Sequence, residues 1–312
     1  MPDLILDLET QDPDDILTLC LVGGHPAIRL RAVTVTPGSP AQVGLVRHVL
    51  RLLDLDDVAV GAVDPGTGKD HVSGFHHRWL GSRRGAPPDA PPADVIAGTL
   101  RSHPGATLLT GGPPRNLGRF LGACPEVRLS RWVAQGGFAG DNVVPPEHRL
   151  PKFEGRTVCP TFNFNGAPRA ALLALSSKDR IARRELVSKN VTHGVLYDRE
   201  FHERLRPYRE RTAGLALVFA GMEHYLRERP EGKLLHDPTA ACVVLDRAIA
   251  TWAEVEVIRE RGEWGVLPAA GSGTFITTSI DHERFFEVFV GENIGPDGAD
   301  VVSGAPVATE TP

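Results

Sequence analysis

Short apolar runs alternate with helical patterns along the first half of the chain, and this alternation limits the folds that the chain can adopt. The apolar runs predict five strands, at 4–7, 30–36, 58–60, 107–109 and 132–134. The segments between them predict four helices, at 14–22, 42–53, 93–101 and 117–121. Such alternation is typical of an α/β fold in which an open, mostly parallel sheet is flanked by helices on both faces.

One domain is enough to account for this pattern. We expect it to span residues 1–294, since a chain of 312 residues can bury a substantial core in a single α/β unit. Residues 295–312 lack hydrophobic periodicity and are predicted to form a flexible C-terminal tail. Two irregular segments, 62–92 and 138–160, are predicted to be functional loops, and His76 in the first of them is expected at the surface.

Five carboxylates crowd the segment directly after the first predicted strand. They are Asp7, Glu9, Asp12, Asp14 and Asp15. Open α/β sheets bind their ligands at this end of a strand, and so many negative charges are costly unless water or a cation neutralises them. Oxygen ligands favour Ca²⁺ or Mg²⁺ over zinc. The alternative is a solvated loop in which Asp12 or Asp14 caps the next helix, but the segment contains no Lys or Arg, which favours a cation site.

Composition excludes several classes of function. The net charge of −5 gives no broadly basic surface, so we expect no nucleic-acid partner. No apolar run is long enough for a membrane span, and the N-terminus has no signal-peptide pattern. The four cysteines form no CxxC pair, and we expect buried, reduced thiols in a cytoplasmic protein.

Four separated blocks resemble the inosine-uridine nucleoside hydrolase family, in the order in which that family carries them. They lie at 7–15, 110–117, 135–171 and 236–241, and a later stretch at 279–286 fits the family's last strand and helix. The first block is similar to the family pattern Asp-x-Asp-x-x-x-Asp-Asp, with one extra residue and a Glu for the second Asp. Each block alone is a weak signal, whereas four in the right order are specific.

The resemblance implies a calcium-dependent hydrolase that cleaves the N-glycosidic bond of a ribonucleoside or a related ribosyl compound. Departure of the base leaves an oxocarbenium-like ribosyl cation, which nearby carboxylates stabilise. A water molecule on the metal has a lowered pKa and can lose its proton to an adjacent acid. Ca²⁺ accepts many oxygen ligands, so it can hold both this water and the sugar hydroxyls.

The resemblance also implies which residues form the site. The metal ligands would be the side chains of Glu9, Asp14, Asp15 and Asp237 together with the backbone carbonyl of Thr110. The substrate would be held by Asp14, Asn142, Asn163 and Asp237, since carboxylates and amides can bond sugar hydroxyls.

Three residues are implied in catalysis. Glu9 stands where the family has the acid that both contacts the metal and acts as the base. Its extra methylene and the one-residue insertion leave Asp12 as a competitor for the role of base. His236 stands where some family members keep the acid that protonates the leaving base, and an imidazole that titrates near neutrality suits that task.

Two departures from the family pattern bear on the substrate. Thr161 stands where the family has the Glu that binds the ribose 5′-hydroxyl, and Ala167 replaces the Asp of an Asp-Pro pair. Losing a carboxylate at the 5′ end removes a repulsion against a 5′-phosphate. We therefore expect a substrate that is larger or more anionic than a simple nucleoside.

Other functions stay open at this point. A non-catalytic homologue that binds calcium and a ribose or nucleotide would keep the same metal ligands. A haloacid-dehalogenase-type phosphatase also uses acids after its first strand, but it leaves the other three blocks unexplained.

Family resemblance further suggests a homodimer or homotetramer. Residues 189–193 read as the end of a further strand, and His193 is a candidate for the rim of the pocket.

Overall fold

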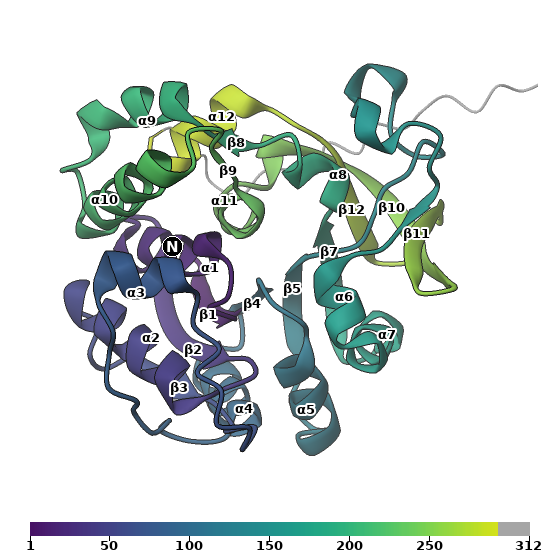
Figure 1. Cartoon of the computed structure of the whole chain (residues 1–312). Coiled ribbons are helices and arrows are strands. Elements are labelled where there is room, and N and C mark those ends of the chain that lie inside the picture. The colour runs from purple at the N-terminus through teal and green to yellow at the C-terminus, as the bar shows by residue number, and fades with distance from the viewer. Residues whose placement is uncertain (293–312) are drawn as a thin grey trace, which may run out of the picture.

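The computed structural model describes residues 1–292, which form one ten-stranded sheet with helices on both faces (Figure 1). The strands, in their order across the sheet, are β3 (Ala59–Gly61), β2 (Arg29–Val35), β1 (Asp3–Leu8), β4 (Thr107–Thr110), β5 (Leu129–Gln135), β7 (Ile181–Val187), β12 (Thr274–Ile280), β10 (Ala250–Glu260), β11 (Glu263–Pro268) and β6 (Val158–Cys159). Neighbouring strands run parallel from β3 to β12 and antiparallel from β12 to β6. Two short strands, β8 (Leu196–Tyr197) and β9 (Lys233–Leu234), form a separate antiparallel pair.

Helices connect these strands and cover the sheet. They are α1 (Pro13–Gly24), α2 (Pro40–Leu52), α3 (Gly74–Leu80), α4 (Pro92–Ser102), α5 (Arg115–Ala123), α6 (Phe162–Gly166), α7 (Pro168–Ser176), α8 (Lys189–Thr192), α9 (Arg199–Leu205), α10 (Ala213–Glu228), α11 (His236–Leu245) and α12 (His282–Phe289). Short 3₁₀ turns lie at Pro146–His148, Pro151–Phe153, Arg206–Tyr208 and Arg247–Ile249.

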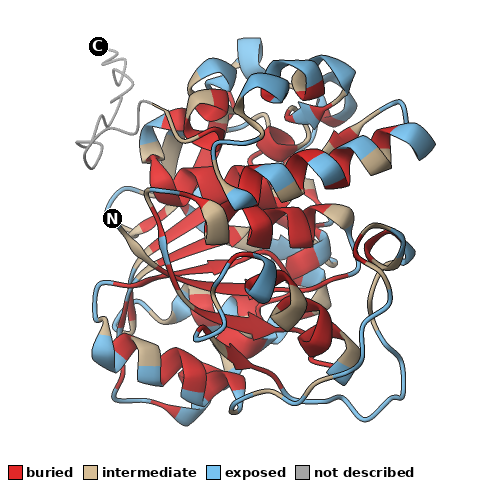
Figure 2. Ribbon diagram, turned by 90° about the vertical axis from the view of Figure 1, so that its left-hand side faces the viewer, coloured by how far each residue is buried: buried red, intermediate tan, exposed pale blue. Residues whose placement is uncertain are grey.

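The core lies in two layers, one on each side of the sheet. Successive side chains of a strand point to opposite faces, so Leu4 and Leu6 pack with α1, α2, α10, α11 and α12, whereas Ile5 packs with α4, α5 and α7. Figure 2 shows the buried residues gathered in the sheet and on the inner faces of the helices. Because both faces are covered, most residues of the parallel strands are buried, although β2, β5 and β7 also carry arginines.

The structure confirms the predicted fold class and every strand and helix named above for the first half of the chain. One expectation was wrong: residues 189–192 form helix α8, because Ser188 leaves the sheet in an N-cap conformation after β7 has ended. The predicted end of the domain at residue 294 and the tail at 295–312 lie outside the described residues.

Two predictions from composition can be compared with the described part of the chain. No helix within residues 1–292 has the length and apolar character needed to cross a membrane. All four cysteines are buried and free of disulfides, as expected.

Candidate active site

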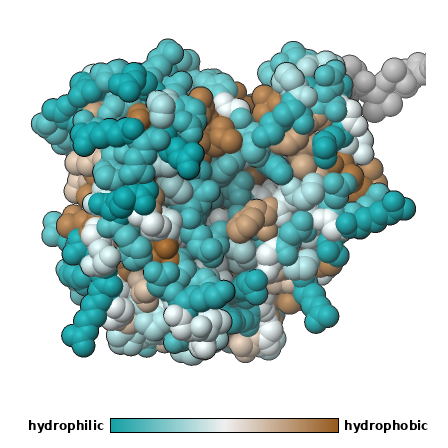
Figure 3. Space-filling view, viewed as in Figure 1, coloured by the Kyte–Doolittle hydropathy of each residue, from teal (hydrophilic) through white to brown (hydrophobic). Residues whose placement is uncertain are grey.

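The acidic segment follows β1 and lies where several strand ends and helix starts meet. Asp7 pairs across the sheet with Thr110 at the end of β4, and α1 and α11 begin nearby. These elements converge near the centre of the view in Figure 1, and the space-filling view from the same side is hollowed there, with a hydrophilic floor (Figure 3). The position agrees with the rule that open α/β sheets bind ligands at the carboxyl ends of their strands.

Asp7 ties three elements together beneath this hollow. Its Oδ1 atom accepts hydrogen bonds from Thr34 Oγ1 at 2.7 Å and from Asn116 Nδ2 at 2.8 Å, so the carboxylate joins β1 to β2 and α5. Its Oδ2 atom is buried and has no hydrogen-bond partner within residues 1–292. Burial raises the pKa of Asp7 to about 7, against the two hydrogen bonds, which lower it.

Asp15 and Asp237 come from distant parts of the chain and face each other in the first turns of α1 and α11. Their exposed fractions are 2% and 4%. Burial raises both pKa values well above the usual range for a carboxyl, and for Asp15 the next cause is the charge of Asp237. Two buried carboxylates this close need a proton or a cation between them.

Gly111 allows β4 to end directly beside this pair. A Cβ atom at position 111 would lie only 2.5 Å from Asp237 Oδ2, a separation that real side chains do not adopt. The Gly111 N–H donates to the Asp7 carbonyl at 2.8 Å, which fixes the turn after Thr110. Thr110, whose backbone carbonyl is a predicted ligand, is the last residue of β4 and directly precedes this turn.

Glu9 and Asp12 differ in their surroundings. Glu9 is 6% exposed, and burial, followed by the charges of Asp12 and Asp14, raises its pKa to about 7. The Asp12 side chain is 50% exposed and forms an ion pair with Lys233. Asp12 also takes the N-cap position of α1, and its backbone N–H donates to Asp15 Oδ2 at 2.9 Å. Asp12 thus caps α1, as the alternative for this segment expected, but Glu9, Asp14 and Asp15 are buried rather than solvated.

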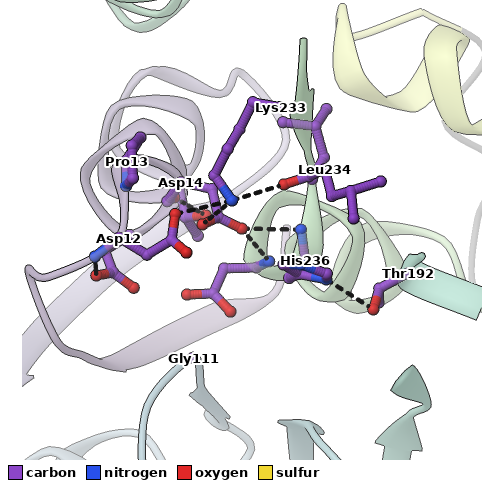
Figure 4. Close-up of polar contacts among 12 residues, drawn as sticks. Asp12, Pro13, Asp14, Gly111, Thr192, Lys233, Leu234 and His236 are labelled. Carbon is purple, nitrogen blue, oxygen red and sulfur yellow. Dashed lines mark hydrogen bonds and ion pairs between the residues drawn. The ribbon is translucent and has the colours of Figure 1, made fainter. Parts of the chain in front are cut away.

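Asp14 is held on both sides of its carboxylate (Figure 4). Its Oδ2 atom accepts the backbone N–H groups of His236 at 2.8 Å and Asp237 at 3.1 Å, so it caps the start of α11. Its Oδ1 atom lies 3.1 Å from the Lys233 ammonium. Although burial opposes it, the Lys233 charge lowers the pKa of Asp14.

Lys233 was missed in the sequence, although it stands only three residues before His236 in the fourth family block. It is 8% exposed on β9, and its ammonium lies 2.8 Å from Asp12 and 3.1 Å from Asp14. The acidic segment itself has no cation, but the fold brings one to it from the far end of the chain. This ammonium neutralises the Asp12–Asp14 side of the cluster and leaves Glu9, Asp15 and Asp237 without a basic side chain in direct contact among residues 1–292.

His236 lies beside the acids, but it does not titrate near neutrality as we expected. Its Nδ1 atom is 2.9 Å from Thr192 Oγ1, and its ring packs edge-on against His193 at 5.0 Å between centroids. Burial, with the Lys233 charge next, lowers the pKa of His236 to about 4, so the free imidazole is neutral at pH 7. His193 does lie next to His236, consistent with a place at the rim.

The two predicted asparagines lie in different settings. Asn163 is 5% exposed, and its Nδ2 atom donates to the Gly111 carbonyl at 2.8 Å and to Gln135 Oε1 at 2.7 Å. It thereby connects α6 to the turn beside Asp237. Asn142 is exposed and donates to the Val266 carbonyl of β11 at 2.6 Å; within the described chain no hydrogen bond joins it to the acids.

One histidine was misplaced by sequence reasoning. We expected His76 at the surface, but its exposed fraction is 0% because α3 packs against the acidic segment. Its Nδ1 atom lies 3.1 Å from the Thr10 carbonyl, and burial lowers its pKa to about 4. The ring thus supports the loop between β1 and α1.

The type of ligand atoms present, and not their arrangement, supports a metal at this site. Within residues 1–292, no group of three or more His, Cys, Asp and Glu side chains has the arrangement of a formed metal site. The buried carboxylates of Asp15 and Asp237 and the Oδ2 atom of Asp7, which has no hydrogen-bond partner within residues 1–292, nevertheless offer oxygen atoms to a cation. Such a set suits a hard cation better than a soft one.

Comparison with known proteins gives a consistent result. The profile of the inosine-uridine preferring nucleoside hydrolases matches residues 4–287. An uncharacterized protein of Aquifex aeolicus (strain VF5) is 29% identical over 294 residues, covering 90% of this chain and 95% of its own. The pyrimidine-specific ribonucleoside hydrolase RihA of Salmonella newport (strain SL254) is 28% identical over 262 residues, covering 77% and 79%.

Solved structures share the fold. The plant nucleoside hydrolase PpNRh1 superposes with a TM-score of 0.69 at 18% identity, over 95% of this chain and 99% of that one. The purine-preferring ribonucleoside hydrolase from Gardnerella vaginalis gives 0.66 at 19% identity, over 93% and 97%. Since the profile match spans nearly all of the described chain, the protein belongs to the inosine-uridine preferring nucleoside hydrolase family.

Proposed function

We propose that the protein is an N-ribosyl hydrolase that requires Ca²⁺ and cleaves the N-glycosidic bond of a ribonucleoside or a related ribosyl compound. The observation that carries this proposal is the meeting of Asp15 and Asp237, both buried, beside the turn at Thr110 and Gly111. These residues come from three separate family blocks, and only the fold brings them together.

Asp15, Asp237, Glu9 and the Thr110 carbonyl would hold the ion. All four offer oxygen atoms, which Ca²⁺ prefers, and the repulsion between the buried carboxylates would be relieved by a divalent charge. When bound, Ca²⁺ would supply an acidified water and an anchor for the sugar hydroxyls. We assign Asp14 to the sugar rather than to the ion, because its carboxylate is already engaged by α11 and Lys233.

Side chains of the site would perform the other steps of hydrolysis. Glu9 is buried at the end of β1 and is our choice as the base that accepts a proton from water. The carboxylates of Asp14 and Asp237 would stabilise positive charge as it develops on the ribosyl ring. His236 would contact the leaving base, and its neutral imidazole would supply a hydrogen bond rather than a full positive charge.

A non-catalytic homologue that binds calcium and a sugar is the alternative, and one experiment separates the two. Release of free base from inosine, uridine and their 5′-monophosphates is followed with added Ca²⁺ and with a chelator. We expect turnover that needs Ca²⁺ and that falls at least a hundredfold in Asp237→Ala. Calcium binding without release of base from any of the four compounds would favour the alternative.

A further inference from the structure

A second feature is a groove of about 610 Å³ between α5 and α7. Three arginines line it, namely Arg115, Arg119 and Arg169, and the other lining residues are Gly, Ala, Pro and Leu. The groove contains no acidic side chain, although Asp and Glu outnumber Lys and Arg in the chain, by 39 to 34. Its charge is therefore uniformly positive.

These arginines have no carboxylate partner among residues 1–292. Arg115 Nη2 donates to the Gly166 carbonyl at 2.5 Å, and Arg119 Nη1 donates to Asn116 Oδ1 at 2.9 Å. Each bond uses part of a guanidinium group, which carries five N–H donors. Other arginines in the chain do pair with acids; Arg204, for example, meets Glu283. Three guanidinium groups without carboxylates thus remain available to an anion.

The two helices add to the positive character of the groove. Arg115 is the first residue of α5, and Arg169 lies in the first turn of α7, each a helix of nine residues. The N-terminus of a helix carries a partial positive charge and free N–H groups, both of which favour anions. Oxygen atoms of a phosphate group match this combination of guanidinium forks and helix termini.

The groove borders the acidic site through shared elements. Asn116, next to Arg115, donates to Asp7, and the charge of Arg115 lowers the pKa of Glu9, although burial keeps that pKa raised. Gly166, whose carbonyl Arg115 binds, closes helix α6, which also carries Asn163. The start of α5 and the end of α6 therefore belong both to the groove and to the surroundings of the acids.

A buried hydroxyl in the connecting segment has no partner. Thr161 precedes α6 with an exposed fraction of 3%, and its Oγ1 atom makes no hydrogen bond within the described residues. An unpaired buried hydroxyl is costly, and an oxygen-rich ligand would satisfy it. Residues 161–166, which carry both Thr161 and Asn163 and end at the groove, thus contain an unpaired hydroxyl and no acidic side chain.

We propose that Arg115, Arg119 and Arg169 bind the phosphate of a 5′-phosphorylated ribosyl substrate, so that nucleoside 5′-monophosphates are hydrolysed in preference to free nucleosides. This inference rests on the proposed function, since the acids must act at C1′. With C1′ at the acids, O5′ lies on the other side of the sugar ring, and we place its phosphate in the groove. Water adds across the C1′–N bond, the base leaves with a proton, and the phosphate ester is unchanged.

Turnover provides the first test. We expect kcat/KM for inosine and uridine 5′-monophosphates to exceed the values for the free nucleosides at least tenfold. The double variant Arg119→Gln/Arg169→Gln should abolish this preference and leave kcat/KM for the nucleosides unchanged, because charged hydrogen bonds to the phosphate are lost. Arg204→Gln, which breaks a surface pair far from the groove, is the matched control and should change neither value. Equal use of nucleosides and monophosphates by the wild type overturns the proposal.

Binding provides a test that does not depend on turnover. Calorimetric titration with ribose 5-phosphate, ribose and inorganic phosphate should give the tightest binding for ribose 5-phosphate, with a loss of at least tenfold in the double variant. Ribose 5-phosphate binding without hydrolysis of any compound would support the groove and refute the proposed function. Inorganic phosphate that binds as tightly as ribose 5-phosphate, or binding that the double variant leaves unchanged, refutes the groove alone.

Discussion

The ammonium of Lys233 lies 3.1 Å from Asp14 Oδ1 and joins the start of β9 to the start of α1. The other oxygen of the same carboxylate caps α11, so Asp14 is fixed from two directions. This arrangement divides the acidic cluster into a half that the protein neutralises itself, at Asp12 and Asp14, and a half that it does not, at Glu9, Asp15 and Asp237. We expect the two halves to respond differently to mutation and to calcium.

Replacing Lys233 tests the neutralised half. Lys233→Met leaves the Asp14 carboxylate buried without its counter-charge, and we expect unfolding free energy to fall by about 3 kcal/mol. The half-exposed Asp12 adds little to this loss. Arg101→Met, which breaks the exposed pair with Glu126, is the control and should cost less than about 1 kcal/mol. Urea unfolding measures both, and equal small losses would show that Lys233 does not support the cluster.

Replacing Asp237 tests the other half. In the wild type, Ca²⁺ should raise the melting temperature, because a ligand that binds only the folded state stabilises it. In Asp237→Asn the buried repulsion with Asp15 is removed, so we expect little loss of stability without calcium and no rise with it. Differential scanning fluorimetry across a Ca²⁺ titration checks this. A variant that keeps the full calcium shift would exclude Asp237 as a ligand.

Replacing Gly111 tests whether activity needs the close approach of the turn after β4 to Asp237. In Gly111→Ala the new methyl group would lie 2.5 Å from Asp237 Oδ2, so the carboxylate has to move. We expect hydrolysis to fall at least a hundredfold, since small displacements in an active site have large effects on rate. Gly122→Ala is the matched control, because its Cβ would meet nothing within 4 Å, and activity should be retained. Retained activity in both variants would contradict the site geometry.

The lowered pKa of His76 predicts that the free energy of unfolding depends on pH. Its pKa is about 4 in the folded protein, because of burial, against about 6.5 for an unfolded histidine. Between these values the unfolded state binds a proton that the native state does not, so stability falls as the pH drops from about 6.5 to about 4, by about 3 kcal/mol in total.

A variant isolates this contribution from those of other buried histidines. His76→Gln lacks the titrating ring, so the stability advantage of the wild type over the variant should shrink from pH 7 to pH 4.5. Urea unfolding at both pH values measures the difference. An advantage that stays constant would mean that His76 does not remain neutral in the folded protein.

Local patterns explain what could be predicted from the sequence. The apolar run at Leu4 and Leu6 marks β1, and the acids that follow it lie at the predicted end of the sheet. The resemblance to the family also assigned Asp15 and Asp237 to one metal site, although they are more than 200 residues apart in the sequence. Contacts between distant segments left no such local trace. In the sequence, Lys233 cannot be distinguished from an ordinary surface lysine, because its ion pair with Asp14 forms only in the folded chain. Likewise, the sequence does not show the burial that lowers the pKa of His236.

Release of free base in the presence and absence of Ca²⁺ is the decisive measurement for the proposed hydrolase activity. The wild type and Asp237→Ala are incubated with inosine, uridine and their 5′-monophosphates, with Ca²⁺ or with a chelator, and free base is quantified by chromatography. We expect the wild type to release base only when Ca²⁺ is present, and the variant to be slower by at least a hundredfold. Release that continues undiminished in the chelator, or in Asp237→Ala, would show that hydrolysis does not depend on a calcium ion held by Asp237.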